Sequence, residues 1–172
     1  MLKTHISQQI YAKLSFEATN NQKKIIESLS EWLSNNDFGS IFLLNGYAGT
    51  GKTSIIAAFV AAIKTLGIKP ILLAPTGRAA KVLTRYSGEV AYTIHKKIYR
   101  ERSITDYESR FSLDYNREHD AVFIVDEASM LSASSTEGAT FGSGNLLEDL
   151  VTYVRSGKRC RLMIVGDDAQ LP

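Results

Sequence analysis

The stretch that decides the fold is GYAGTGKT, residues 46–53, which matches the pattern G-x-x-x-x-G-K-[ST]. An apolar run, SIFLLN (40–45), precedes it, and apolar residues at helical spacing, from Ile55 to Ile63, follow it. A strand, a glycine-rich turn and a helix in this order form the context that a phosphate-binding loop requires. The sequence therefore predicts such a loop at the carboxyl end of a buried strand.

Each residue type in this loop has a chemical reason to be there. Glycines let backbone N–H groups close around phosphate oxygens at the start of a helix, whose dipole favours anions. We expect Lys52 to reach the β- and γ-phosphates of ATP and the Thr53 hydroxyl to ligate Mg²⁺. The residues expected to cradle the nucleotide are Gly46, Ala48, Gly49, Thr50, Gly51, Lys52, Thr53 and Ser54. The alternative is a glycine-rich turn with a solvated lysine and no nucleotide-binding role.

Outward from the loop, apolar strands alternate with amphipathic helices. Further strands, buried like the first, are expected at 69–74, 121–126 and 160–166, and helices at 19–33, 76–86 and 146–157. This alternation predicts an α/β fold with a mainly parallel sheet. Residues 101–119 are expected to form a surface loop or small hairpin, and residues 132–145 a mobile loop. Residues 1–13 carry weak signals and are interpreted as a lead-in to a domain spanning 14–172.

Two carboxylates follow the apolar run at 121–125. The carboxyl end of a parallel strand faces the crevice in which α/β proteins bind ligands. We therefore expect Asp126 to hold the hydration shell of Mg²⁺, and Glu127 to orient or deprotonate the attacking water. Such a pair can also be a solvated or helix-capping feature.

Composition narrows the class of protein. A chain of 172 residues with a net charge of +2 suits one domain and does not by itself indicate a partner. The single cysteine, Cys160, excludes an internal disulfide and fits a reducing compartment. With three scattered histidines, it makes no recognisable metal-ligand cluster. The sequence shows neither a secretory signal nor a run long enough to span a bilayer, so we expect a cytoplasmic protein without a membrane partner.

Five stretches, taken together with the phosphate loop, resemble superfamily 1 DNA helicases, specifically the RecD-like branch that includes the exodeoxyribonuclease V alpha subunit. They are LSFEATNNQKKII (14–26), APTGRAAKVL (74–83), AYTIHKKIY (91–99), VDEASM (125–130) and VGDDAQLP (165–172). The resemblance implies a P-loop NTPase of the RecA-like type, a three-layer sandwich that binds ATP and Mg²⁺.

The resemblance also assigns roles to single residues. It implies that Gln22 contacts adenine and that Gln170 senses the γ-phosphate and couples it to DNA. The catalytic set is then Lys52, Asp126, Glu127 and Gln170. Contacts to single-stranded DNA are implied for Pro75, Thr76, Arg78, Thr93, His95 and Lys96.

Charge is concentrated near the implied DNA motifs. Seven Lys and Arg residues between Arg78 and Arg102 face only two glutamates, a local net charge of +5. A basic stripe of this kind fits a groove that follows a phosphate backbone. Four aromatic side chains could add surfaces for base stacking or could simply pack in the domain: Tyr86, Tyr92, His95 and Tyr99.

Family helicases have a second RecA-like domain, whose arginines neutralise charge on the transferred phosphoryl group. Arg155, Arg159 and Arg161 lie before the fourth strand and do not fit that part. We therefore expect an N-terminal fragment that binds ATP–Mg²⁺ weakly, hydrolyses it poorly and cannot unwind DNA alone. The intact protein is expected to be an ATP-dependent DNA helicase that moves 5′ to 3′ by analogy, in DNA repair or recombination and with nuclease or repair partners unknown.

Three alternatives remain open. A PhoH-like or other RNA-directed ATPase would share the loop and the acidic strand end, although TIHKKIY and GDDAQLP fit the RecD-like pattern better. A non-catalytic, nucleotide-gated nucleic-acid-binding module is the second alternative. A small-molecule kinase is the third, and the sequence shows no counterpart of its arginine-rich lid.

Overall fold

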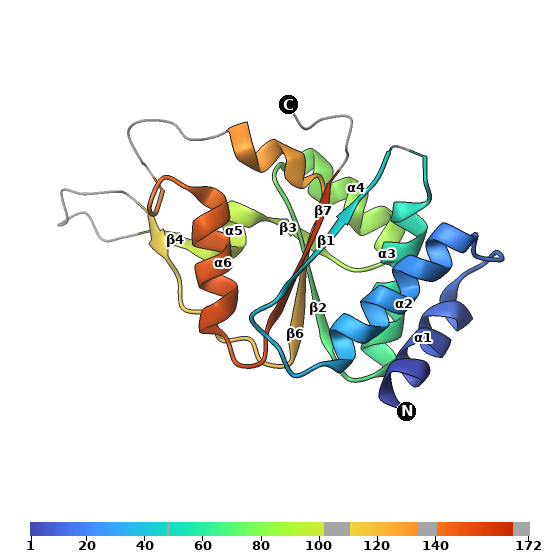
Figure 1. Ribbon diagram of the computed structural model, residues 1–172. Helices are drawn as coiled ribbons and strands as arrows, with labels where there is room; N and C mark the ends of the chain where they lie inside the picture. Colours follow the sequence, from blue (N-terminus) through green and yellow to red (C-terminus); the bar gives the residue numbers. More distant parts are fainter. Residues whose placement is uncertain (48, 102–110, 134–140, 167–172) are drawn as a thin grey trace.

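The computed structural model describes residues 1–47, 49–101, 111–133 and 141–166. A five-stranded sheet with the strand order β1-β7-β6-β2-β3 runs through the middle of the domain (Figure 1). All of its strand pairs are parallel. Its strands are β1 (Ile41–Asn45), β2 (Lys69–Ala74), β3 (Ala91–Thr93), β6 (Ala121–Val125) and β7 (Arg161–Gly166). The expected parallel α/β fold is confirmed, with the short β3 as an unpredicted addition.

Helices cover both faces of this sheet, because alternate residues of each strand point to opposite sides (Figure 1). Leu72 and Ile124 enter one apolar cluster, whereas Leu73 and Phe123 enter the other. The first cluster lies under α2 (Asn20–Ser34), α3 (Lys52–Thr65) and α4 (Gly77–Ser87). The second lies under α5 (Ile94–Ile98), α6 (Leu146–Ser156) and the hairpin of β4 (Tyr99–Glu101) and β5 (Phe111–Leu113). The three-layer arrangement is therefore present.

Helix α1 (Leu2–Lys13) forms in the segment interpreted from its weak sequence signals as a lead-in. It packs on the outside of α2 and α3 (Figure 1). Its Ile6 and Ile10 are buried in the first apolar cluster. These two positions lie one helical turn apart and are the helix's only buried residues, so they leave little periodicity for a sequence pattern to reveal.

Strand β1 differs from the prediction of burial throughout. Leu44 is buried, but Leu43 is 63% exposed. Among the described strands, β1 is hydrogen-bonded to β7 on one side and lies at the edge of the sheet on the other. An apolar run predicts a strand well, but its position in the sheet decides whether both faces are covered.

The two polar segments have anchored parts. A hairpin does form, with Tyr99 opposite Leu113, while its tip at 102–110 lies outside the described residues. In the segment 132–145, Phe141 stacks on Phe111 at a centroid distance of 4.4 Å, and the Gly142 N–H donates to the Phe111 carbonyl at 3.0 Å. These contacts join residues 141–142 to the hairpin, while the predicted mobility of the segment remains a prediction. Residues 132–133 belong to a 3₁₀ helix, Ala128–Ala133, and 134–140 are not described.

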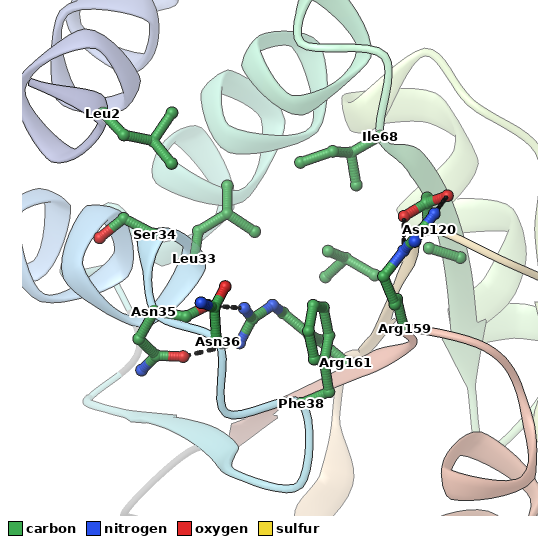
Figure 2. A pocket seen from close by; sticks show the side chains of 12 residues that line it. Leu2, Leu33, Ser34, Asn35, Asn36, Phe38, Ile68, Asp120, Arg159 and Arg161 are labelled. Carbon is green, nitrogen blue, oxygen red and sulfur yellow. Dashed lines mark hydrogen bonds and ion pairs between the residues drawn. The ribbon is translucent and has the colours of Figure 1, made fainter.

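A cavity of about 190 Å³ lies at the amino ends of the strands, opposite the phosphate loop (Figure 2). The buried Arg161 guanidinium packs on the Phe38 ring at 4.4 Å and donates to the Asp37 carbonyl and the Asn35 side chain, at 2.9 and 3.0 Å. Arg159 forms two hydrogen bonds to Asp120. These two arginines therefore lie at the amino ends of the strands. This position agrees with the inference that they do not take part in phosphoryl transfer.

Candidate nucleotide and nucleic-acid site

The carboxyl ends of the strands bring the predicted site segments to one edge of the sheet. Asn45, the last residue before the phosphate loop, lies opposite Gly166 of β7. The Asp126 N–H donates to the Leu73 carbonyl at 3.0 Å, which places the acidic strand end beside β2. Parallel strands that end together form the crevice at which this class of sheet binds ligands.

The phosphate loop has the backbone that its sequence demands. Gly49 and Gly51 have φ values of +79° and +82°, in the left-handed region that a side chain disfavours. Gly51 is the N-cap of α3, so the N–H groups at the start of the helix lie at the loop. The Thr50 hydroxyl donates to the Tyr47 carbonyl at 2.8 Å. The loop and the helix start therefore form a concave set of donors for an anion.

Lys52 folds back over this loop. Its ammonium group donates to the Gly46 carbonyl and, at 2.8 Å, to the Tyr47 carbonyl. A Cβ on Gly46 would lie 3.6 Å from Lys52 Cδ, in ordinary van der Waals contact, so the lysine side chain lies directly over the start of the loop. The charge of Lys52 is thus held inside the curve of the loop, where the sequence predicts phosphate oxygens.

Gln22 lies against the loop as well. Its side chain accepts a hydrogen bond from the Thr19 N–H at 2.9 Å and closes a capping box at the start of α2. A Cβ on Gly51 would meet Gln22 Nε2 at 2.4 Å, so position 51 has no space for a side chain. Gln22 is only 7% exposed. Its described contacts are with the α2 cap and the loop, and a contact to adenine remains a prediction.

Asp126 and Glu127 follow β6 directly. Asp126 is half-buried and Glu127 is exposed, with a φ of +55°. Asp126 Oδ1 accepts the backbone N–H of Glu127 at 2.9 Å, and Asp126 Oδ2 accepts the hydroxyl of Tyr86 from α4. Burial and then the hydrogen bond to Asp126 raise the pKa of Tyr86 above its ordinary value, so the phenol remains a donor. Sequence reasoning missed this bond, because no spacing rule joins positions 86 and 126.

Tyr86 also lines a cavity to which Thr53, the other ligand expected for Mg²⁺, contributes. This cavity of about 250 Å³ is lined by Thr53 at the start of α3, by Phe16 of the α1–α2 connection and by Tyr86. A threonine hydroxyl and one carboxylate suit Mg²⁺, which keeps several waters and binds substrate phosphates. Within the described residues, no group of three or more metal-binding side chains exists. A magnesium site that phosphates and water complete needs no such group. The residues fit the ion.

The implied DNA-contacting segments lie side by side, because Ala74 of β2 pairs with Thr93 of β3. Thr76 caps α4 by accepting the Ala79 N–H at 3.2 Å. Thr93 caps α5 by accepting the Lys96 N–H at 3.3 Å. Both hydroxyls therefore serve as helix caps. Of the residues predicted to contact single-stranded DNA, Thr76, Arg78 and Lys96 are exposed.

The aromatic and basic residues near this surface divide into two groups. Tyr92 is 41% exposed, and Lys96 Nζ lies 5.8 Å from the centre of its ring. Tyr99 is buried, and the half-buried His95 packs against the Phe141 ring at 5.0 Å. Burial lowers the pKa of His95 and favours its neutral form. Base stacking by Tyr99 is therefore excluded by its burial, and Tyr86 is engaged with Asp126.

Two predicted residues lie outside the described part of the chain: Ala48 of the loop and Gln170 of the GDDAQLP stretch. The basic stripe is partly neutralised where the structure describes it. Lys97 pairs with Glu118 at 2.8 Å, and the Arg100 guanidinium lies 4.8 Å from the Tyr115 ring. Among the described residues, the other positive charges of the stripe lie on α4, at Arg78, Lys81 and Arg85, and at Lys96 and Arg100.

A glycine-rich loop that opens a helix, with a lysine inside it and an acidic strand end beside it, defines a P-loop nucleotide-binding domain. A family profile described as an AAA domain matches residues 18–172. The chain belongs to this family. No helix in the described part of the structure is both long and apolar enough to cross a membrane.

Known relatives confirm the resemblance to RecD-like superfamily 1 helicases. The ATP-dependent RecD2 DNA helicase of Deinococcus radiodurans is 30% identical over 132 residues, or 77% of this chain and 16% of the relative. The ATP-dependent DNA helicase dda of Enterobacteria phage T4 is 40% identical over 92 residues, or 51% of this chain and 20% of the relative. An uncharacterized protein of Methanocaldococcus jannaschii is 34% identical over 142 residues, or 76% of this chain and 11% of the relative. The chain spans a fifth or less of the length of these three relatives.

Proposed function

We propose that this chain is the ATP-binding motor domain of an ATP-dependent DNA helicase of the RecD-like type. The observation that carries the proposal is the meeting of the Lys52 loop and the Asp126 strand end at one edge of the sheet, in a domain related to two DNA helicases. In the whole helicase, hydrolysis of ATP would drive movement along single-stranded DNA, in the 5′ to 3′ direction by family analogy.

The residues divide the work of phosphoryl transfer. Backbone N–H groups of the loop and Lys52 bind and orient the phosphates. Thr53 and Asp126 would hold Mg²⁺, which, when bound, supplies positive charge to the phosphate oxygens. Glu127, exposed beside Asp126, is the group proposed to orient the attacking water and accept its proton. Gln170 is proposed to sense the γ-phosphate.

The DNA surface is proposed to start at the carboxyl ends of β2 and β3. The exposed Thr76, Arg78 and Lys96 are proposed to contact phosphates, and the exposed Tyr92 to stack on a base; their exposure supports these assignments. Pro75, Thr93 and His95 would shape this surface rather than supply charge. A cytoplasmic location and a role in DNA repair or recombination remain predictions.

A test begins with nucleotide binding. The chain is expected to bind a fluorescent ADP analogue in the presence of Mg²⁺, and Lys52→Ala is expected to weaken that binding at least about tenfold, the loss of one charge-assisted contact. Lys64→Ala is the matched control, because Lys64 lies at the far end of the same helix and pairs with Glu89. Equal affinity of Lys52→Ala and the wild-type chain would contradict the assignment of the phosphate site.

A second test concerns the nucleic acid. In the helicase polypeptide that contains this domain, single-stranded DNA is expected to stimulate ATP hydrolysis, and Arg78→Ala is expected to raise the DNA concentration required. Stimulation by RNA alone would instead support the RNA-directed ATPase. Nucleotide-dependent DNA binding without any hydrolysis would support the binding module.

A further inference from the structure

The hydroxyl of Tyr86 is placed where it can act on the magnesium carboxylate. Asp126 has both oxygens engaged, Oδ2 by Tyr86 and Oδ1 by the backbone N–H of Glu127. Rotation of the carboxylate about its terminal bond would break at least one of these hydrogen bonds. The pair of contacts therefore fixes the plane of the carboxylate.

The donor is itself held by a packed element. Tyr86 comes from the last turns of α4, and its ring packs against the first apolar cluster. Ala79, Ala80 and Leu83 bury the inner side of the same helix. Helix α4 is capped at both ends, by Thr76 and by Gly88 in the left-handed conformation. The hydroxyl is thus delivered by a helix whose position is set independently of Asp126.

Tyr86 also borders the other expected ligand of Mg²⁺. It lines the cavity of about 250 Å³ into which Thr53 also opens. A neutral hydroxyl that donates to a carboxylate leaves the negative charge in place and restrains its direction. Carboxylates that serve metals are commonly hydrogen-bonded by such outer partners, and loss of a partner weakens metal affinity about 10- to 100-fold.

We propose that Tyr86 is a positioning residue for the magnesium site: its hydroxyl holds the Asp126 carboxylate in one orientation, and the affinity of the domain for Mg²⁺ with nucleotide depends on that orientation. This inference rests on the proposed nucleotide site. Tyr86 belongs to α4, and the first residues of α4 border the proposed DNA surface. The hydrogen bond from Tyr86 to Asp126 therefore links this helix directly to the proposed magnesium site. The competing explanation is that the bond to Asp126 only satisfies the hydrogen-bonding requirement of a buried hydroxyl.

The test is a titration of Mg²⁺ at a fixed concentration of a fluorescent ADP analogue, with no hydrolysis involved. Tyr86→Phe is expected to raise the half-saturating Mg²⁺ concentration about tenfold. Binding of the analogue in EDTA should change less than about twofold, because the proposed role acts through the metal. Tyr11→Phe is the control, since Tyr11 is exposed on α1 and belongs to neither proposed site, and it should leave both quantities unchanged. Tyr86→Met, which also lacks the hydroxyl, gives a second test should Tyr86→Phe fail to fold.

A double-mutant cycle separates positioning from packing. In an Asp126→Ala background, Tyr86→Phe should change the Mg²⁺ requirement less than about twofold, because its target is gone. A Tyr86→Phe variant that melts at a lower temperature but needs no more Mg²⁺ would overturn the positioning role alone. A wild-type chain that binds no analogue with or without Mg²⁺ would overturn the nucleotide site and this inference together.

Discussion

Two tyrosine–aspartate hydrogen bonds lie on opposite faces of the sheet, and they differ in how the carboxylate is enclosed. On the face covered by α5 and α6, Tyr99 donates to Asp149 at 2.6 Å, and Asp149 also accepts the Ser143 N–H at 2.9 Å. Asp149 is 5% exposed. On the other face, Tyr86 donates to Asp126, which is half-buried at the carboxyl end of β6.

The same pair of side chains can therefore stabilise the fold where the carboxylate is buried, or position a reactive group where the carboxylate is half-buried. Asp149 joins the hairpin, α6 and the segment at 141–145, and no room remains around it: a Cβ on Gly142 would lie 2.1 Å from its Oδ2. Asp126 ends a strand at the edge where the site residues gather. We expect the removal of Asp149 to destabilise the domain and the removal of Asp126 to reduce its activity.

The largest expected effect is that of Asp126→Ala on catalysis. In the helicase that contains this domain, ATP turnover should fall about 10³-fold or more. The reason is that Mg²⁺ loses its carboxylate ligand and no longer stabilises the negative charge that develops during phosphoryl transfer. Steady-state hydrolysis assays measure the loss. Circular dichroism should show a smaller fall in melting temperature than for Asp149→Ala, because Asp126 is half-buried whereas Asp149 is buried. Turnover within tenfold of wild type would place the magnesium ligand elsewhere.

Glu127→Gln is expected to have the next largest effect, on the same edge. The amide keeps the size of the side chain but cannot accept a proton, so turnover should fall about 10²- to 10⁴-fold while nucleotide affinity is kept. Rapid-quench hydrolysis and equilibrium binding of an ADP analogue measure the two quantities separately. Unchanged turnover would show that Glu127 does not orient the attacking water.

Asp149→Ala should act on stability instead. The change leaves the Tyr99 hydroxyl and the Ser143 N–H without their acceptor, at a cost of about 3 kcal/mol in the free energy of unfolding. Urea denaturation measures the loss. Glu148→Ala is the matched control: Glu148 is exposed in the same helical turn, and its loss should cost less than about 1 kcal/mol. Equal losses for the two variants would show that the buried bond is not special.

The smallest expected effect is a change in alkaline stability. Burial, followed by the hydrogen bond to Asp149, raises the pKa of Tyr99 above the unfolded value of about 10. The folded state therefore binds this proton more tightly, so the contribution is fully present below pH 10 and is lost as the pH rises toward the raised pKa. Tyr99→Phe should reduce the fall in unfolding free energy between pH 9 and 11 by about 1 kcal/mol. An identical slope in the variant would contradict the shift.

The sequence was sufficient for the elements that follow local rules. The strand, loop and helix around Lys52 could be predicted because the motif and both apolar patterns agree, and the N-caps at Thr19 and Thr76 mark true helix starts. The ordered motifs also pointed to the right family. Each of these inferences depends on neighbours within a few residues.

The features that were missed depend on distant contacts. The bonds from Tyr86 to Asp126 and from Tyr99 to Asp149 span 40 and 50 residues, and no local pattern encodes them. The exposure of Leu43 follows from the place of β1 in the sheet, which residues 40–45 alone do not determine. Local propensity predicts which elements form, whereas tertiary contacts decide which side chains meet.

The position of β1 has a practical consequence for handling the domain. In the described structure, one side of this strand carries backbone groups that pair with no other strand, and the Leu43 side chain is exposed on a face of the sheet at the same strand. An unprotected apolar edge is a template for pairing with a second chain, and natural sheets blunt such edges with charged side chains. At high concentration, self-association should therefore begin at the strand that leads into the phosphate loop. Leu43→Lys would oppose it without entering the core.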